Sequence, residues 1–420
     1  MIAIAATGFS VMRCGSSKSK DSQSTAPSGK GFSYSSTSNK GDYAEWTFTG
    51  QTLAATWQVI NNTGGVDRTL TLTATCDTYN AKFNYYTCTI NSGTCTLPNS
   101  SSCNEKPEGK VEMMEAPGVA IFVHPQGQDE QLHVGMLKDN SACTADISGN
   151  YIYVNTGLGR KELVGMYNSD SNFIDFTHAD FLMDAGSAGA QPQVKYWSSR
   201  VKGEGTMTDG GCVSGVRTRS TDGATLRSMM TSSGVFILDL PSGMGGMVAM
   251  KQSKVATIAD FANKKFSGIS FPDNGDALPV SLTTGALNGS IVTIASGDMG
   301  DESMGSTIDI RPLSSAQSAA VNPKFPDFTQ FTDAIGSESS SGNSLIGTYH
   351  NLAGIPGLFR LDGNVDDGRV IFVAGKFNNK VVAFGLVYNW RDASDTNPGT
   401  GAQFGKNGLY GTGNFILFER

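Results

Sequence analysis

Polar and apolar residues alternate with a period of two along several short stretches, and this alternation constrains the fold of the chain more than any other feature. Leu70, Leu72, Ala74 and Cys76 alternate with threonines. Successive side chains of a β-strand point to opposite faces, so this pattern predicts a half-buried strand with the cysteine facing the core.

Other segments fit the same style. Residues 53–59 alternate in the same way, and the turn signal at residues 61–65 joins the two strands into a hairpin. Residues 119–137 contain a second predicted hairpin. Residues 236–238 and 370–373 are apolar on both faces, which favours soluble β cores over an outer-membrane barrel with alternating strands.

Composition supports a mainly β protein. Glycine accounts for 51 of 420 residues, and windows rich in Leu, Glu, Lys and Ala are few. We therefore expect antiparallel sandwich or barrel-like domains with short helices. Residues 257–265 and 329–336 are the two segments with helical signals.

The N-terminus has the character of an export signal followed by a spacer. Residues 1–12 form a short apolar run, too short to cross a bilayer as a helix. Residues 15–42 are rich in serine and contain almost no apolar side chains, so we expect a disordered tether over residues 14–42. We expect two β domains after it, residues 43–215 and 216–420, with a boundary in the Gly-rich region.

Residues 11–17, Val-Met-Arg-Cys-Gly-Ser-Ser, resemble the lipobox of bacterial lipoproteins, in which a signal peptidase cuts before a cysteine that carries lipid. Arg13 departs from that motif, which has a small residue there. The resemblance implies a signal peptide over residues 1–13, a lipidated Cys14 and sorting to the outer membrane, since Gly15 follows. In style the chain is similar to surface lipoproteins of predatory Gram-negative bacteria. The alternative is a general secretory signal with an incidental cysteine.

The remaining cysteines are even in number, which in an exported chain predicts disulfide bonds. They are Cys76, Cys88, Cys95, Cys103, Cys143 and Cys212. Six cysteines allow 15 connectivities.

Local geometry favours one pairing. If Asn91-Ser92 formed a two-residue hairpin turn, Cys88 would face Cys95. Cys76 and Cys103 would then enclose that hairpin, leaving Cys143 and Cys212 for each other. The spacing of these cysteines does not match a zinc site.

The acidic and histidine residues offer few candidates for chemistry. Asp175, His178 and Asp180 form the densest local set of possible catalytic or ligating groups. A two-residue turn in the second hairpin would place His124 and His133 on one face about 13 Å apart, too far to share a metal.

Asp362, Asn364 and Asp366 resemble the start of a calcium loop, although a plain hairpin turn is the favoured interpretation. The chain has no Gly-x-Ser-x-Gly motif, no phosphate-binding loop and no dinucleotide fingerprint. We therefore expect no metal and no cofactor, and an enzyme is the less favoured class.

Charge and aromatic content limit the partners. The net charge is −7, and Lys and Arg are spread along the chain, which argues against nucleic acid as a partner. Tyr196 and Trp197 are candidate contact residues, because aromatic side chains bury a large area at low entropic cost.

Three functions are therefore open. We favour a lipid-anchored protein of the outer membrane, on its periplasmic or cell-surface side, that binds an envelope glycan or protein. The alternatives are a secreted hydrolase with a site between two β domains and a structural component of the envelope.

Overall fold

The computed structural model describes residues 26–126, 131–138, 143, 148–156, 164–169, 176–184, 193–200, 208–213, 216–221, 224–230, 234–239, 245–272, 277–300, 302–303, 309–312, 320–322, 325–330, 345–347, 349–350, 357–362, 369–391 and 408–420. These residues are mostly antiparallel strands, which confirms the predicted mainly β class. In the same set of residues, no helix has the length and hydrophobicity needed to cross a membrane.

The first part of the chain forms a closed, eight-stranded antiparallel barrel with its strands in chain order. Its strands are β1 (Gly29–Ser38), β2 (Tyr43–Gly50), β3 (Thr52–Ile60), β4 (Val66–Asn80), β5 (Tyr85–Thr96), β6 (Lys110–Ala116), β7 (Ala120–Pro125) and β8 (His133–Leu137). The alternation seen in the sequence places Leu53, Trp57, Leu70 and Leu72 inside this first barrel. Both predicted hairpins, β3–β4 and β7–β8, are present.

Strand β1 corrects the predicted extent of the tether. Residues 29–38 are not a spacer but pair with both β2 and β8 and so close the barrel. Tyr34 and Ser36 of this strand are fully buried. The serine-rich composition concealed the strand, because the buried polar side chains of Tyr34 and Ser36 find hydrogen-bond partners inside the barrel.

The middle of the chain builds an open ten-stranded sheet. In spatial order its strands are β13 (Thr208–Val213), β14 (Val216–Thr221), β15 (Ala224–Met230), β16 (Val235–Asp239), β17 (Gly246–Lys251), β9 (Gly149–Asn155), β10 (Val164–Ser169), β11 (Phe176–Asp184), β12 (Gln193–Arg200) and β25 (Leu345–Gly347). The predicted domain boundary between residues 215 and 216 falls inside this sheet, because β13 pairs with β14 across it.

The last part of the chain builds a nine-stranded sheet. In spatial order its strands are β19 (Leu278–Asn288), β18 (Lys265–Pro272), β30 (Gly408–Glu419), β29 (Lys380–Arg391), β28 (Arg369–Phe377), β27 (Leu358–Asp362), β22 (Asp309–Pro312), β20 (Ile291–Met299) and β21 (Glu302–Ser303). Because β19 also pairs with β20, this sheet closes into a second barrel, with β21 outside the ring. A small separate sheet contains β23 (Ala320–Asn322), β24 (Phe325–Gln330) and β26 (Tyr349–His350).

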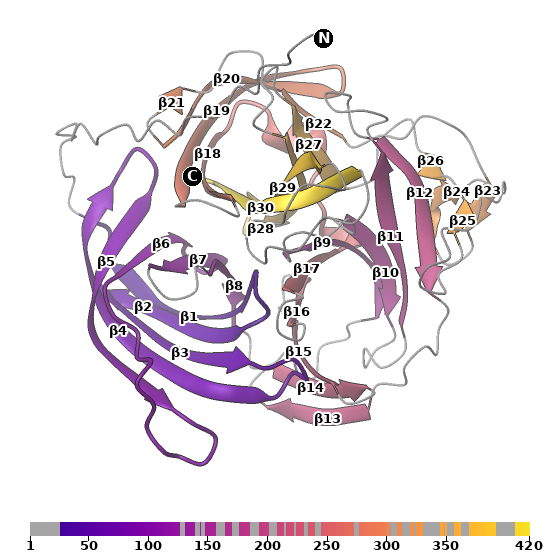
Figure 1. The fold of residues 1–420 in the computed structure, drawn as a ribbon. Coiled ribbons are helices and arrows are strands. Elements are labelled where there is room, and N and C mark those ends of the chain that lie inside the picture. The colour runs from indigo at the N-terminus through magenta and orange to yellow at the C-terminus, as the bar shows by residue number, and fades with distance from the viewer. Residues whose placement is uncertain are drawn as a thin grey trace, which may run out of the picture.

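The three large sheets contribute to one shared apolar core. Figure 1 shows these sheets arranged around the centre of the molecule. Phe122 on the outside of the first barrel lies 6.1 Å from Phe384 and 5.8 Å from Phe418 of the second barrel, measured between ring centroids. Val154 and Val248 of the ten-stranded sheet belong to the same core. Each barrel also has an interior core of its own.

The helical predictions are confirmed only in part. Residues 258–261 form a short 3-10 helix, Ile258–Phe261. At its start, the amide and the hydroxyl of Thr257 both donate to the Asp260 carboxylate, at 2.8 and 2.9 Å. A second 3-10 turn spans Gln252–Lys254. The helix predicted over residues 329–336 is wrong at its start, because Thr329 and Gln330 belong to β24; residues 331–336 lie outside the described residues.

All six predicted cysteines form disulfides, but two of the predicted pairs are wrong. The bonds are Cys76–Cys88, Cys95–Cys103 and Cys143–Cys212. Asn91-Ser92 is not a turn, since both residues lie within the continuous strand β5. The chain reverses instead at residues 81–84, which sets Cys76 of β4 near Cys88 of β5.

Candidate functional site

Strands β2, β3, β4 and β5 present a surface of hydroxyl groups on the outside of the first barrel. Their apolar residues point inward, so the alternate residues point outward and fall into rows across the strands. From β2 to β5 the rows are Thr49, Thr52, Thr75 and Thr89; Thr47, Ala54, Thr73 and Ser92; Glu45, Thr56, Thr71 and Thr94; and, on β3 to β5, Gln58, Thr69 and Thr96. We call these four rows the threonine face.

The hydroxyls of the threonine face are accessible. Thr52, Thr56, Thr89 and Thr94 are exposed, while the threonines of the central strand β4 are half-buried by their neighbours. The Oγ1 atoms of Thr71 and Thr94 lie 2.6 Å apart in a hydrogen bond across β4 and β5. Because a hydroxyl both donates and accepts, the remaining capacity of these groups can serve a ligand.

The threonine face is almost free of charge. Glu45 is the charged residue of the four rows, and the Lys138 ammonium lies 2.7 Å from its carboxylate. Tyr43 also donates a hydrogen bond to the Glu45 carboxylate, at 2.8 Å. Charged groups begin at the end of the rows, where Arg68 binds Asp67 and Glu105, each at 2.8 Å.

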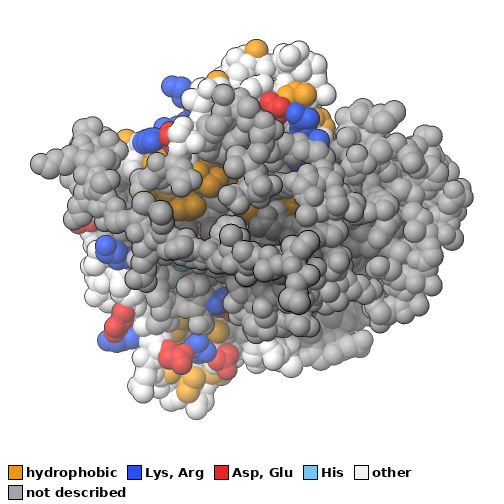
Figure 2. Space-filling view, turned by 45° about the horizontal axis from the view of Figure 1, so that its top comes forward, with side chains coloured by type: hydrophobic (Ala, Val, Ile, Leu, Met, Phe, Trp, Pro, Cys, Tyr) orange, Lys and Arg blue, Asp and Glu red, His pale blue; other side chains and the backbone are white. Residues whose placement is uncertain are grey.

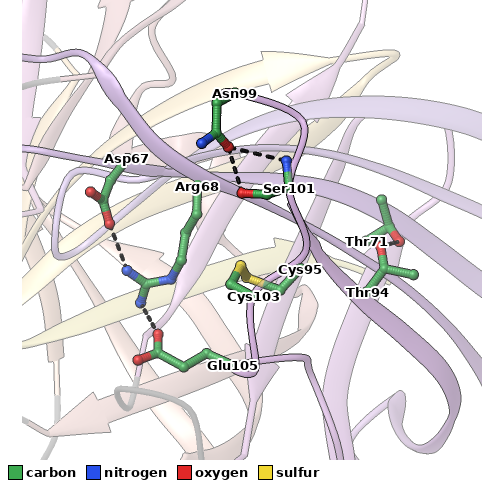
Figure 3. The surroundings of a disulfide bond; sticks show 9 residues. All are labelled: Asp67, Arg68, Thr71, Thr94, Cys95, Asn99, Ser101, Cys103 and Glu105. Carbon is green, nitrogen blue, oxygen red and sulfur yellow. Dashed lines mark hydrogen bonds and ion pairs between the residues drawn. A yellow bond between two sulfur atoms is a disulfide. The ribbon is translucent and has the colours of Figure 1, made fainter. Parts of the chain in front are cut away.

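Two disulfides hold this region in place. Cys76–Cys88 joins β4 to β5 inside the barrel, where both cysteines are fully buried. Figure 3 shows that Cys95–Cys103 ties the segment after β5 back to the end of that strand, beside the Arg68 ion pairs. The threonine face therefore lies on cross-linked strands, which limits how far its rows can move.

A buried polar cluster lies inside the same barrel. The His133 ring lies at 5.2 Å from the Trp46 ring and 5.0 Å from the Trp57 ring, edge to face in both pairs. Ser36 accepts a hydrogen bond from Trp46 Nε1 at 2.8 Å and lies 3.3 Å from His133 Nδ1. Trp57 Nε1 donates to the Asp42 carboxylate at 3.0 Å.

Burial controls the protonation of this polar cluster. Complete removal from water lowers the pKa of His133 to about 3, so the ring is neutral at physiological pH. Burial raises the pKa of Asp42, against the opposing effect of hydrogen bonds from the Ile60 amide, Gln131 and Trp57. These groups lie under the strands of the threonine face and act as parts of the barrel interior.

A tyrosine and a glutamate form another buried pair in this barrel. Tyr34 donates a hydrogen bond of 2.6 Å to Glu115 and accepts one of 3.1 Å from the Gly118 amide. Burial is the main reason why the pKa values of Tyr34 and Glu115 are both raised. Tyr86 donates to the Pro27 carbonyl at 3.0 Å, so the chain preceding β1 runs against the barrel.

The predicted catalytic set is placed only in part. His178 and Asp180 lie in β11, where His178 pairs with Tyr167 and Arg200 on the neighbouring strands. Asp175 lies outside the described residues. Among the described residues, no group of three or more His, Cys, Asp and Glu could hold a metal ion.

The structure describes only some residues of the remaining predicted sites. Asp362 ends β27 opposite Asp309, whereas Asn364, Asp366 and the lipidation residue Cys14 lie outside the described residues. The candidate contact residues Tyr196 and Trp197 lie within β12, paired with Leu182 and Phe181 of β11.

The two histidines of the second hairpin differ from the predicted register. His133 pairs with Val123, the neighbour of His124, so the two histidines lie on opposite faces. His133 points into the barrel, while His124 lies 4.8 Å from Phe271 of the second barrel and 3.1 Å from the Glu112 carboxylate. The expected separation of the rings on a common face is therefore wrong.

Sequence reasoning missed the threonine face, although its signal is present. The alternation at residues 69–76 predicts that the apolar residues are buried. In that prediction the threonines are merely the residues that face solvent. Threonines at 47, 49, 52 and 56 in the two preceding strands carry the same signal. The missing information was the pairing register that sets these strands side by side.

Two comparisons with known proteins found no match. No family model matches this chain. No curated protein matches it significantly either.

Proposed function

We propose that the chain is an exported, lipid-anchored protein that binds a component of the bacterial envelope through the threonine face. The observation that carries this proposal is the set of hydrogen-bonding rows on β2 to β5, accessible to solvent and nearly uncharged. Four neighbouring strands with hydroxyls at most outward positions form a surface suited to binding, since a preorganised array loses little entropy on contact.

Export is supported by the cysteine chemistry. The three disulfides join cysteines 8, 12 and 69 residues apart, unlike a Cys-x-x-Cys redox pair, and such structural bonds persist in oxidising compartments outside the cytoplasm. The apolar run of residues 1–12 and the lipobox-like residues 11–17 support a lipid anchor at Cys14. Among the residues coloured in Figure 2, the charged side chains lie in small groups of mixed sign, which fits an uncharged partner better than a strongly charged one.

Binding is tested by co-sedimentation of the purified protein with envelope fragments of the native host. The variant Thr52→Lys/Thr94→Lys places two cations on exposed positions of the threonine face, and we expect its binding to be at least tenfold weaker. Thr293→Lys, on an exposed position of β20 in the second barrel, is the matched control and should bind like the unaltered protein. Equal binding by all three proteins would contradict the proposal.

Anchoring is tested separately by mass spectrometry of protein recovered from the membrane fraction. We expect a mature chain that begins at a diacylglyceryl-modified Cys14. A chain that begins elsewhere and carries no lipid would remove the anchor from the proposal, without affecting the binding test.

A further inference from the structure

The chemistry of the threonine face also indicates what it binds. We infer that its ligand is a neutral polysaccharide of the cell envelope, an inference that rests on the proposed binding function. The rows present hydroxyl and methyl groups side by side, and the carboxylate of Glu45 is neutralised by Lys138. An uncharged chain of sugar rings exposes hydroxyl groups and C–H groups, which can meet the threonine hydroxyls and methyl groups respectively.

Charge argues against other classes of ligand. The four rows contain no Lys or Arg, so they lack the cations that would attract nucleic acid or an acidic polymer. The large apolar side chains of these strands, such as Trp46, Phe48 and Leu72, are buried inside the barrel. The threonine face therefore offers no apolar area of the size that a lipid surface requires.

The composition of the rows also argues against a protein partner. Protein interfaces depend on a few anchors, most often Trp, Tyr and Arg, that enter desolvated pockets. No such residue occurs in the four rows as defined. Tyr43, which lies opposite Gln58 and would extend the fourth row onto β2, is buried in the shared core, and Trp57 and Tyr86 are buried inside the barrel. The surface lacks anchors of that kind but has many equivalent weak contacts, which suits a repetitive polymer.

Threonine is well suited to such contacts. Its branched Cβ restricts χ1, so little side-chain entropy is lost when its hydroxyl forms a hydrogen bond. Neighbouring strands are about 4.8 Å apart, and outward residues follow one another every 6.7 Å or so along a strand. This grid lets several hydroxyls meet successive hydroxyls of a sugar chain, while the methyl groups contact its C–H surface.

The preference of threonine for β-strands does not by itself explain why threonines are concentrated in the four rows. Thr is favoured in strands, but Val, Ile and Tyr are favoured too, and other solvent-facing positions of this barrel carry charges. Asp67 and Asp77 of β4 and Lys110 of β6 are exposed positions of this kind beside the threonine face. Charged side chains therefore border the four rows, within which Glu45 is the one charged residue.

The inference is tested by affinity electrophoresis of the purified protein in gels that contain the neutral polysaccharide fraction of the host envelope, with alginate as the anionic comparison. We expect retardation by the neutral fraction only. Thr52→Val/Thr56→Val/Thr94→Val removes three exposed hydroxyls and keeps the branched shape, and retardation should weaken at least tenfold. Thr293→Val in the second barrel is the matched control and should leave retardation unchanged.

The outcomes separate this inference from the proposed function. Envelope binding that is lost in Thr52→Lys/Thr94→Lys, without retardation by the neutral fraction, would overturn the polysaccharide and leave the binding surface intact. Retardation unchanged in the valine variant would also overturn the inference. A third outcome would also overturn the inference. If the protein is not retarded but inhibits ice recrystallisation, and the valine variant does not, the threonine face binds ordered water instead of a polysaccharide.

Discussion

At the scale of single residues, the first barrel depends on polar groups that have left water. His133 is completely buried between Trp46 and Trp57, and its Nε2 atom has no hydrogen-bond partner among the described residues. A buried imidazole of this kind remains neutral, because protonation would place a charge in an apolar interior. Sequence alone indicated two histidines in one hairpin but not this environment, which depends on tryptophans from β2 and β3.

The His133 ring should make the protein sensitive to acid. The unfolded chain binds this proton below pH 6.5, whereas the folded chain does so only near pH 3, so stability falls as pH decreases between these values. The loss is about 1.4 kcal/mol per pH unit. We expect His133→Phe to flatten the pH slope of urea unfolding between pH 6.5 and 4.5.

Asp42 and Glu115, whose pKa values are raised, act in the opposite direction and are present in both proteins. Comparing slopes instead of absolute stabilities removes their contribution, along with any uniform packing loss in the variant. Identical slopes for the two proteins would show that His133 does not carry the effect.

At the scale of elements, the alternation predicted strands well and their partners poorly. The apolar faces of β3 and β4 and the turn between them follow from local sequence alone. The cysteine pairing failed because β5 continues through Asn91 and Ser92, with an irregularity in its pairing to β4 at Thr73 and Ala74. The prediction missed strand β1 because its inward-facing residues include hydrogen-bonded serines such as Ser36. By composition alone, a serine-rich strand looks the same as a serine-rich spacer.

The disulfides of the first barrel should differ in their response to reductant. Both sulfurs of Cys76–Cys88 are buried, whereas Cys103 of Cys95–Cys103 is only partly buried. Thiol exchange requires access to a sulfur. Under mild reduction followed by alkylation and peptide mass spectrometry, we expect Cys95 and Cys103 to be labelled first. Equal labelling of Cys76 and Cys88 in the native protein would contradict the buried pairing.

At the scale of the whole molecule, the three large sheets are joined by polar contacts as well as by their common core. Thr156 after β9 accepts a hydrogen bond from the Gly246 amide at 2.7 Å, and its carbonyl accepts one of 3.1 Å from Asn414 of the second barrel. Its hydroxyl also lies 3.3 Å from the Ser38 carbonyl of the first barrel. Such contacts join residues that are far apart in the sequence, and local sequence patterns do not reveal them. The prediction from composition therefore placed the domain boundary inside a sheet.

Substitution of one glycine, Gly64, can measure how much the contact between the first barrel and the ten-stranded sheet contributes to stability. Gly64, in the β3–β4 turn, has φ +77°, and a Cβ there would overlap the Thr225 carbonyl oxygen. Its own carbonyl accepts a hydrogen bond of 2.9 Å from Arg227, and the Thr63 carbonyl accepts one of 2.7 Å from the Thr225 amide. Gly64→Ala must therefore displace the ten-stranded sheet as well as strain the turn.

Gly50→Ala is the matched control, because Gly50 also has a positive φ, +61°. Apart from its chain neighbours, no described residue has a heavy atom within 4 Å of the position that a methyl group would take there. We expect Gly50→Ala to lower the free energy of unfolding by about 1 kcal/mol through backbone strain alone. Gly64→Ala should cost about 2 kcal/mol more, since two hydrogen bonds of about 1 kcal/mol each are lost with the contact. Urea unfolding of both variants measures the difference, and equal losses would show that the sheets are not coupled through this turn.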